Sequence, residues 1–191
     1  MNTSPLMPLP PAFRAALRDR LRARAAAAGL DGLLLLAPGN VAYASGWLVS
    51  VNERPMGLWL PVADEAVLMV PRLELENALA VPGVRVATYE EFPGPVPPAL
   101  WMVGEARARR IAVDALDARH LRAAEAMVER LDLADHAGPE RAVKRPEEVA
   151  LIREAARFAD LVLERLLARA SDMIAGGATE LDLMADCTGH A

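Results

Sequence analysis

The sequence has one cysteine, few aromatic residues and no long apolar run. Cys187 is the single cysteine among 191 residues, so the chain forms no internal disulfide. This favours a reducing compartment, and we expect a cytoplasmic protein. Phe, Trp and Tyr make up 4% of the residues, which is too few for a base-stacking surface. No apolar run approaches the roughly 18 residues of a membrane helix. Residues 1–11 lack the basic and apolar regions of a signal peptide.

The charge pattern also excludes a nucleic-acid-binding surface. The formal net charge is −5, and arginines are interleaved with Asp and Glu rather than gathered in a basic stripe. The hydrophobic fraction of 53% and the charged fraction of 25% are those of a globular chain. A length of 191 residues indicates one domain, or one domain plus a fragment.

The usual patterns of catalytic and metal-binding residues are missing as well. The three histidines, His120, His136 and His190, are not spaced to share a helix face. No glycine-rich phosphate loop and no G-x-S-x-G segment is present. Ser45 and Ser50 have no base that the sequence assigns to them. We therefore predict no catalytic residue and no metal ligand in this chain, although a pocket that brings Arg54 to an acid or histidine would support a small α/β enzyme.

Hydrophobic periodicity predicts alternating helices and strands after a flexible, proline-rich arm at residues 1–11. Phe13, Leu17 and Leu21 recur at helical spacing within a helix at 12–28. Further helical segments are expected at 40–45, 73–79, after Pro97 and at 118–130. Strands are expected at 33–37, 57–62, 66–70, 84–88, 110–114 and 133–137. The pattern predicts an α/β fold, a mixed sheet with helices on its faces, in which 57–70 forms an antiparallel hairpin.

The C-terminal quarter has a different pattern. Pro146, Glu147 and Glu148 are typical of a helix start. An apolar stripe from Val149 to Ala170 then indicates one long helix at 147–173, about 40 Å in length. Thr179 and Asp182 have the spacing of a capping box for a second helix. We expect an N-terminal α/β domain at 12–138, a linker and long helix at 139–175, and the start of another domain at 176–191.

Several segments resemble the N-terminal part of the creatinase, prolidase and aminopeptidase P family of pita-bread metallohydrolases. Asn40-Val-Ala-Tyr43-Ala-Ser-Gly46-Trp47 resembles the family's N-x-x-Y-x-(S/T)-G-(F/W) segment, and Arg54-Pro55 its R-P position. Pro71-Arg-Leu-Glu74 resembles the segment that follows its hairpin. The linker motif R-x-x-K-x-x-x-E-(I/V)-x-x-(I/M)-R-x-A is matched by Arg141, Lys144, Glu148, Ile152, Arg153 and Ala155. Gly177-Ala-Thr179-Glu180 matches its G-x-T-E segment.

The resemblance implies hydrolysis of the bond before a proline, or of creatine-like substrates, by relatives that bind two divalent metal ions. Their metal ligands, two Asp, one His and two Glu, lie beyond the G-x-T-E segment, so the resemblance implies no cofactor in this chain. Arg54, with Asn52 beside it, aligns with a residue that holds a substrate carboxylate in the partner subunit's active site. From the residues alone, Arg54 is equally a surface arginine before a proline. Arg141, Lys144 and Glu148 would form a salt-bridged hinge between domains.

Two hypotheses of different classes follow. The first is an N-terminal dimerisation and substrate-capping domain of an Xaa-Pro dipeptidase or aminopeptidase P-like enzyme, inactive alone and truncated before the catalytic domain. A homodimer is then expected, and a peptide with proline in second position is the substrate in a full-length context. The second hypothesis is a stand-alone binding or scaffold module, which self-associates or pairs with a full-length paralogue.

Overall fold

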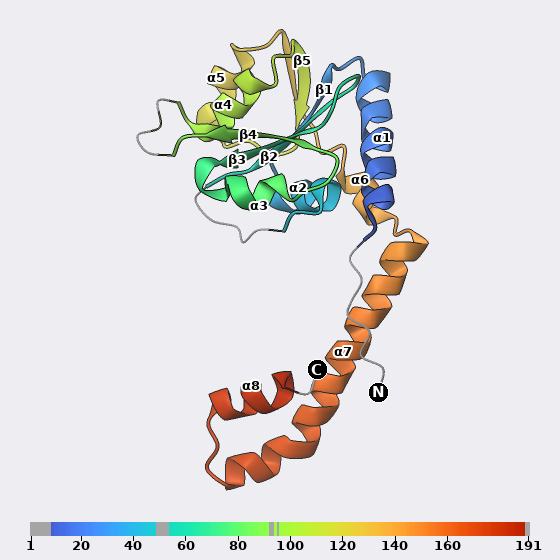
Figure 1. Cartoon of the computed structure of the whole chain (residues 1–191), viewed down its shortest axis with the longest axis vertical. Coiled ribbons are helices and arrows are strands. Elements are labelled where there is room, and N and C mark those ends of the chain that lie inside the picture. The colour runs from blue at the N-terminus through green and yellow to red at the C-terminus, as the bar shows by residue number, and fades with distance from the viewer. Residues whose placement is uncertain (1–8, 49–53, 92–93, 95, 190–191) are drawn as a thin grey trace. The chain divides into compact units, whose positions relative to one another are not determined.

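The computed structural model describes residues 9–48, 54–91, 94 and 96–189, and it divides into two compact units (Figure 1). The boundary between them lies between Val143 and Lys144. We call residues 9–143 the α/β unit and the residues from Lys144 onward the helical unit. Each is described by itself.

The α/β unit is built on a six-stranded sheet with the order β4-β3-β2-β1-β5-β6. Strand β2 is antiparallel to both β1 and β3, whereas the pairs β3–β4, β1–β5 and β5–β6 are parallel. The mixed sheet and the hairpin predicted at 57–70 are therefore confirmed. The strands are β1 (Gly32–Leu35), β2 (Gly57–Pro61), β3 (Val67–Pro71), β4 (Arg85–Tyr89), β5 (Arg110–Val113) and β6 (Arg130–Leu133).

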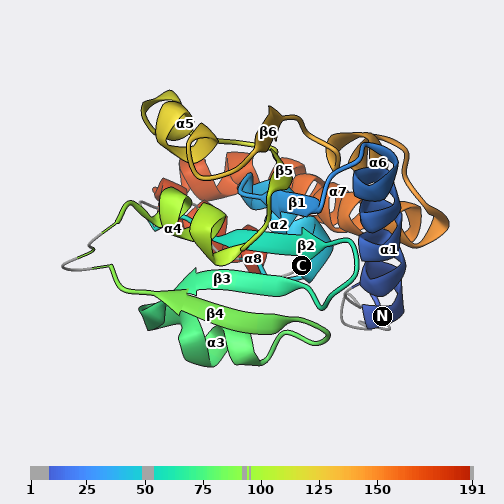
Figure 2. The same ribbon diagram turned by 90° about the horizontal axis from the view of Figure 1, so that it is seen from above.

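Helices cover both faces of this sheet, which explains why the central strands are continuous apolar runs. Along β1, Leu33 and Leu35 enter one core cluster and Leu34 enters the other. The first cluster is covered by α1 (Pro11–Ala27), α2 (Pro38–Ser45) and α3 (Leu75–Leu79), which follows the 3-10 turn η1 (Arg72–Glu74). The second is covered by α4 (Pro98–Glu105) and α5 (Ala118–Glu125). Figure 2 shows β4, β3, β2 and β1 side by side in this order, from the bottom of the view upward.

The last part of the α/β unit differs from the sequence prediction. The helix expected at 118–130 ends at Glu125, and the strand expected at 133–137 is found at Arg130–Leu133. The reason is pairing with β5: the Arg130 N–H donates to the Arg109 carbonyl, and Arg110 lies opposite Arg130 in parallel register. A short helix, α6 (Gly138–Ala142), follows and was not predicted.

The helical unit is a helical hairpin of α7 (Pro146–Ala175) and α8 (Glu180–Thr188). The capping box predicted at Thr179 is confirmed, since the Thr179 N–H donates to the Asp182 carboxylate at 2.8 Å. Arg165 of α7 pairs with Asp186 of α8 through two hydrogen bonds of 2.7 Å. Seven large apolar side chains of the hairpin remain exposed: Ile152, Leu163, Leu166, Leu167, Ile174, Leu181 and Met184.

Candidate functional site

Polar side chains gather at one edge of the sheet, where the five mutually parallel strands end. Chain segments that leave β1, β4, β5 and β6 supply Asn40, Glu91, Asp114 and Asp135. Because β2 runs in the opposite direction, Arg54 before its first residue belongs to the same edge. The carboxyl ends of parallel strands are where α/β folds usually bind ligands, and we therefore treat this edge as the candidate site.

The first cluster at this edge centres on Asn40, which is only 1% exposed. Its Nδ2 donates to Asp114 Oδ2 at 2.7 Å and to Asp135 Oδ1 at 2.9 Å. Its Oδ1 accepts from Arg141 Nη1 at 2.9 Å. One amide therefore joins two carboxylates and a guanidinium, and every polar atom of its side chain is satisfied, as burial demands.

The two carboxylates also hold backbone N–H groups. Asp114 Oδ1 accepts from the N–H groups of Leu36 and Ala37, which lie between β1 and α2. Asp135 Oδ1 accepts from the N–H groups of Ala137 and Gly138. The Asn40 cluster, defined as Asn40, Asp114, Asp135 and Arg141, thus fastens the ends of β1, β5 and β6 to α6. This bonding is structural.

Tyr43, which lies in α2 with Asn40, also contacts α6. The Tyr43 hydroxyl donates to the Glu140 carbonyl at 3.4 Å, and the Glu140 carboxylate accepts from Arg20 at 2.8 Å and Arg24 at 3.0 Å. The segment 40–46 and residues 140–141, which are far apart in the sequence, therefore meet in the α/β unit.

The second cluster holds Arg54 against the end of β4. Arg54 Nε lies 3.3 Å from Glu91 Oε1, and the two side chains are 35% and 19% exposed. The Tyr89 hydroxyl donates to the Pro55 carbonyl at 2.8 Å, while its ring packs at a tilt on Trp101 with centroids 5.9 Å apart. Glu91 therefore holds the Arg54 guanidinium, and Tyr89 holds the backbone that follows Arg54.

The surroundings of Tyr89 raise the pKa of its hydroxyl to about 12. Burial is the main cause, the Glu91 carboxylate raises the pKa further, and the Arg54 guanidinium lowers it. Because the folded-state pKa exceeds the ordinary value of 10.0, folding favours the protonated phenol. Its contribution to stability is complete below pH 10, and it is lost as the pH rises from there toward 12.

We expect Glu91→Gln to lower the Tyr89 pKa, because it removes the nearby negative charge. Arg54→Gln is expected to raise it. Absorbance at 295 nm measured against pH in a Tyr43→Phe background, where Tyr89 is the one remaining tyrosine, checks both directions. An unchanged titration in Glu91→Gln would contradict an effect of the Glu91 carboxylate on the Tyr89 hydroxyl.

The residues singled out from the sequence are distributed between the two units. Arg54 lies in the second cluster, and Asn52 lies outside the described residues. Arg141 lies in α6 of the α/β unit, with its guanidinium on Asn40. Lys144 and Glu148 belong to the helical unit, where the Glu148 carboxylate accepts from the Arg145 N–H at 3.0 Å. The hinge role of these residues and the ligand role of Arg54 stay predictions.

Sequence reasoning missed Asp114, Asp135, Tyr89 and Glu91. Asp114 directly follows β5, Asp135 comes two residues after β6, and Tyr89 ends β4 with Glu91 two residues later. An acid just past a buried strand was a usable signal, but it gains meaning only when the strands are known to be parallel. Asp135 was missed for a second reason: the last strand was predicted at 133–137, so Asp135 was placed within it rather than after its end.

The described residues offer no metal centre. Among them, no three His, Cys, Asp or Glu side chains come together as ligands. What the edge does offer chemically is the Arg54 guanidinium, a group suited to pair with a carboxylate.

The fold is an α/β domain whose sheet is covered by helices on both faces, with polar side chains gathered at the edge where its parallel strands end. The chain belongs to the Creatinase/Prolidase N-terminal domain family, whose profile matches residues 18–153. A curated relative, the probable dipeptidase PepE of Mycobacterium tuberculosis (strain H37Rv), is 29% identical over 175 residues. That match covers 86% of this chain and 44% of the relative. The chain thus spans less than half the length of the curated relatives it matches.

Solved structures show the same fold. Dipeptidase PepE from Mycobacterium ulcerans is 26% identical with a TM-score of 0.62, and the match covers 82% of this chain and 44% of that one. An Xaa-Pro dipeptidase from Bacillus anthracis is similar with a TM-score of 0.65 at 18% identity, over 81% of this chain and 43% of that one. A creatinase/prolidase N-terminal domain of an X-Pro dipeptidase from Streptococcus pyogenes has a TM-score of 0.52 at 19% identity. That match covers 61% of this chain and 98% of the Streptococcus pyogenes domain.

Within the described residues, no helix has the length and hydrophobicity needed to cross a membrane.

Proposed function

We propose that this chain is the N-terminal dimerisation and substrate-capping domain of an Xaa-Pro dipeptidase or aminopeptidase P-like metallopeptidase. The observation that carries the proposal is the family match over residues 18–153, together with relatives that are more than twice as long as the matched region. In this proposal two divalent metal ions and their ligands belong to the remaining part of such an enzyme. The substrate is a peptide with proline in second position, and the location is cytoplasmic.

Arg54 is the residue that we propose to touch substrate, across the interface with a second subunit. A guanidinium binds a carboxylate through two parallel hydrogen bonds when its plane is held in one orientation. Glu91 contacts the Nε side of Arg54, and Tyr89 fastens the Pro55 carbonyl. Both contacts reduce the side-chain and backbone freedom that binding would otherwise have to remove.

The proposal predicts that the chain alone does not hydrolyse Xaa-Pro dipeptides. The assay is product release from such dipeptides with Mn²⁺, Co²⁺ or Zn²⁺ added in turn, and a full-length PepE relative serves as the positive control. We expect no turnover above the blank. Robust metal-dependent turnover that is removed by a chelator would overturn the assignment as an accessory domain.

The second candidate function, a self-associating scaffold module, is favoured by the exposed apolar side chains of the α7–α8 hairpin. Apolar patches of this kind are typical of interaction surfaces. Light scattering at micromolar concentration tests it: a dimer that dissociates in Leu163→Gln/Leu167→Gln but not in Arg54→Gln supports self-association through the hairpin. A monomeric wild-type chain would exclude this candidate and also the dimer that the first proposal expects.

A further inference from the structure

A second polar region lies at the opposite edge of the sheet, where the parallel strands begin. It is an open pocket of about 760 Å³ between the β2–β3 turn, the start of β4 and the segment from α4 to β5. Its size is within the range of small-molecule sites. All of its lining residues belong to the α/β unit, and Arg54 and the Asn40 cluster do not line it.

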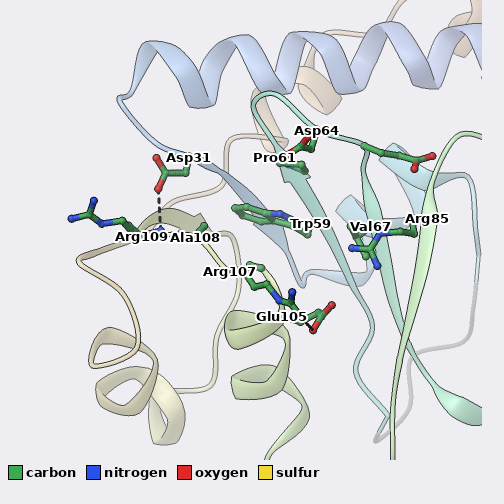
Figure 3. Close-up of a pocket in the computed structure, with 12 residues that line it drawn as sticks. Asp31, Trp59, Pro61, Asp64, Val67, Arg85, Glu105, Arg107, Ala108 and Arg109 are labelled. Atoms are coloured by element: carbon green, nitrogen blue, oxygen red, sulfur yellow. Dashed lines mark hydrogen bonds and ion pairs between the residues drawn. The ribbon is translucent and has the colours of Figure 1, made fainter.

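Trp59 of β2 lies in the middle of this pocket (Figure 3). The indole crosses the first residue of β1, where a Cβ added to Gly32 would stand 2.5 Å from Trp59 Cη2. The residue is 5% exposed, so its ring is held firmly while its edge borders the pocket. A fixed indole beside a cavity is a suitable apolar contact for the body of a ligand.

Some charged side chains around the pocket already form an ion pair with an oppositely charged side chain, and others do not. Asp31 accepts from the N–H groups of Arg109 and Arg110 and from the Arg110 guanidinium, and Arg109 pairs with Glu129. In the described part of the chain, no ion pair involves Arg85, Asp64 or Glu65. Arg107 approaches Glu105 only to 4.0 Å.

These less-compensated charges have both signs, and they come from different chain segments around the indole. Asp64 and Glu65 lie in the turn after β2, whereas Arg107 follows α4 and Arg85 begins β4. Figure 3 shows Asp64 and Arg107 on the two sides of Trp59. Such an arrangement matches a ligand with a positive and a negative end better than it matches a simple anion or cation.

The backbone at Arg107 provides an independent indication. Its φ of 48° makes it the one non-glycine residue with positive φ in the described chain. The position ends α4, with the Arg107 N–H donating to the Gly104 carbonyl at 3.2 Å, and glycine is the residue usually found there. An unfavourable conformation retained by a charged side chain at a pocket is typical of a functional position.

We propose that this pocket binds a small zwitterion, a free amino acid or short peptide. Its ammonium group contacts Asp64 and Glu65, its carboxylate contacts Arg85 and Arg107, and its body lies along the edge of Trp59. The site is separate from Arg54, and the inference does not depend on the proposed peptidase context.

The test is a titration of the whole 191-residue chain with alanyl-alanine, monitored by two-dimensional ¹H–¹⁵N NMR. We expect shifts of the Trp59 indole N–H and of the backbone amides at 64, 65, 85 and 107. N-acetyl-alanyl-alanine lacks the ammonium and alanyl-alaninamide lacks the carboxylate. Each is expected to bind about tenfold more weakly or worse, as the loss of a hydrogen bond between charged groups implies.

Matched variants complete the experiment, and all of them replace exposed side chains. In Arg85→Gln/Arg107→Gln, alanyl-alanine and alanyl-alaninamide should bind with equal affinity. In Asp64→Asn/Glu65→Gln, alanyl-alanine and N-acetyl-alanyl-alanine should bind with equal affinity. Arg119→Gln, which removes an exposed arginine of α5 paired with Asp117, should change nothing. The proposal is overturned if alanyl-alanine shifts no pocket resonance, if the blocked peptides bind equally well, or if the pocket variants bind like wild type.

Discussion

Asn40→Ala is expected to lower the free energy of unfolding of the α/β unit by about 2–3 kcal/mol, because a buried amide loses three hydrogen bonds to charged partners. The substitution removes the amide hydrogens shared by Asp114 and Asp135 and the oxygen that accepts from Arg141. The two carboxylates would then face each other without the donor between them, which adds repulsion to the lost hydrogen bonds.

Urea unfolding followed by tryptophan fluorescence measures this effect cleanly. Trp47, Trp59 and Trp101 all lie in the α/β unit, so the signal reports that unit rather than the helical hairpin. Asn77→Ala is the matched control, since Asn77 is exposed and bonds only Glu74 three residues away. Its expected cost is within about 0.5 kcal/mol. A loss below about 1 kcal/mol for Asn40→Ala would show that the Asn40 cluster does not hold the strand ends together.

The second large effect is expected from Gly32→Ala. A Cβ at this position would lie 2.5 Å from the Leu60 carbonyl oxygen and 2.5 Å from Trp59 Cη2. The neighbouring backbone belongs to β2, which pairs with β1, so relief requires either a shift of the central strands or a new orientation of the indole. Overpacking of this kind costs about 1–3 kcal/mol, and we expect the upper end because a backbone atom is involved.

The same urea experiment applies, and the emission spectrum of the folded state gives a second measurement because Trp59 is displaced. Gly104→Ala in α4 is the control, since its added Cβ would meet only the flexible end of Met127 at 3.2 Å. A glycine in a helix loses stability relative to alanine, so this control should be neutral or slightly stabilising. Equal stability of Gly32→Ala and wild type would show that the Trp59 ring is not held where the structure places it.

Much of the fold could be predicted because the signals are local. The short apolar run at 33–37 suits a strand covered on both faces, and the spacing of Phe13, Leu17 and Leu21 indicates a helix with one buried face. Both were confirmed, with Leu17 and Leu21 completely buried. The prediction of the last strand was wrong because Arg130-Leu-Asp-Leu133 is only four residues long and little buried. Its conformation comes from pairing with β5, which no local pattern contains.

The candidate site was predicted only in part. Arg54 was found because it lies in a recognisable Arg-Pro position, whereas its ion-pair partner Glu91 is 37 residues away in sequence and follows three intervening strands, β2, β3 and β4. Arg141 was assigned to the hinge because the linker motif begins with it. Its hydrogen bond to Asn40, 101 residues away, became visible only when α2 and α6 were brought together.

By itself, the sequence determined the class of fold, the long helix with its capped successor, and the family to which the chain belongs. These depend on periodicity, capping and motif spacing, which act over a few residues. Tertiary structure alone decided which acids bind Asn40, which carboxylate holds Arg54, and that Trp59 borders a pocket of mixed charge. Those contacts depend on strand order and direction, because parallel strands far apart in sequence deliver their ends to one edge of the sheet.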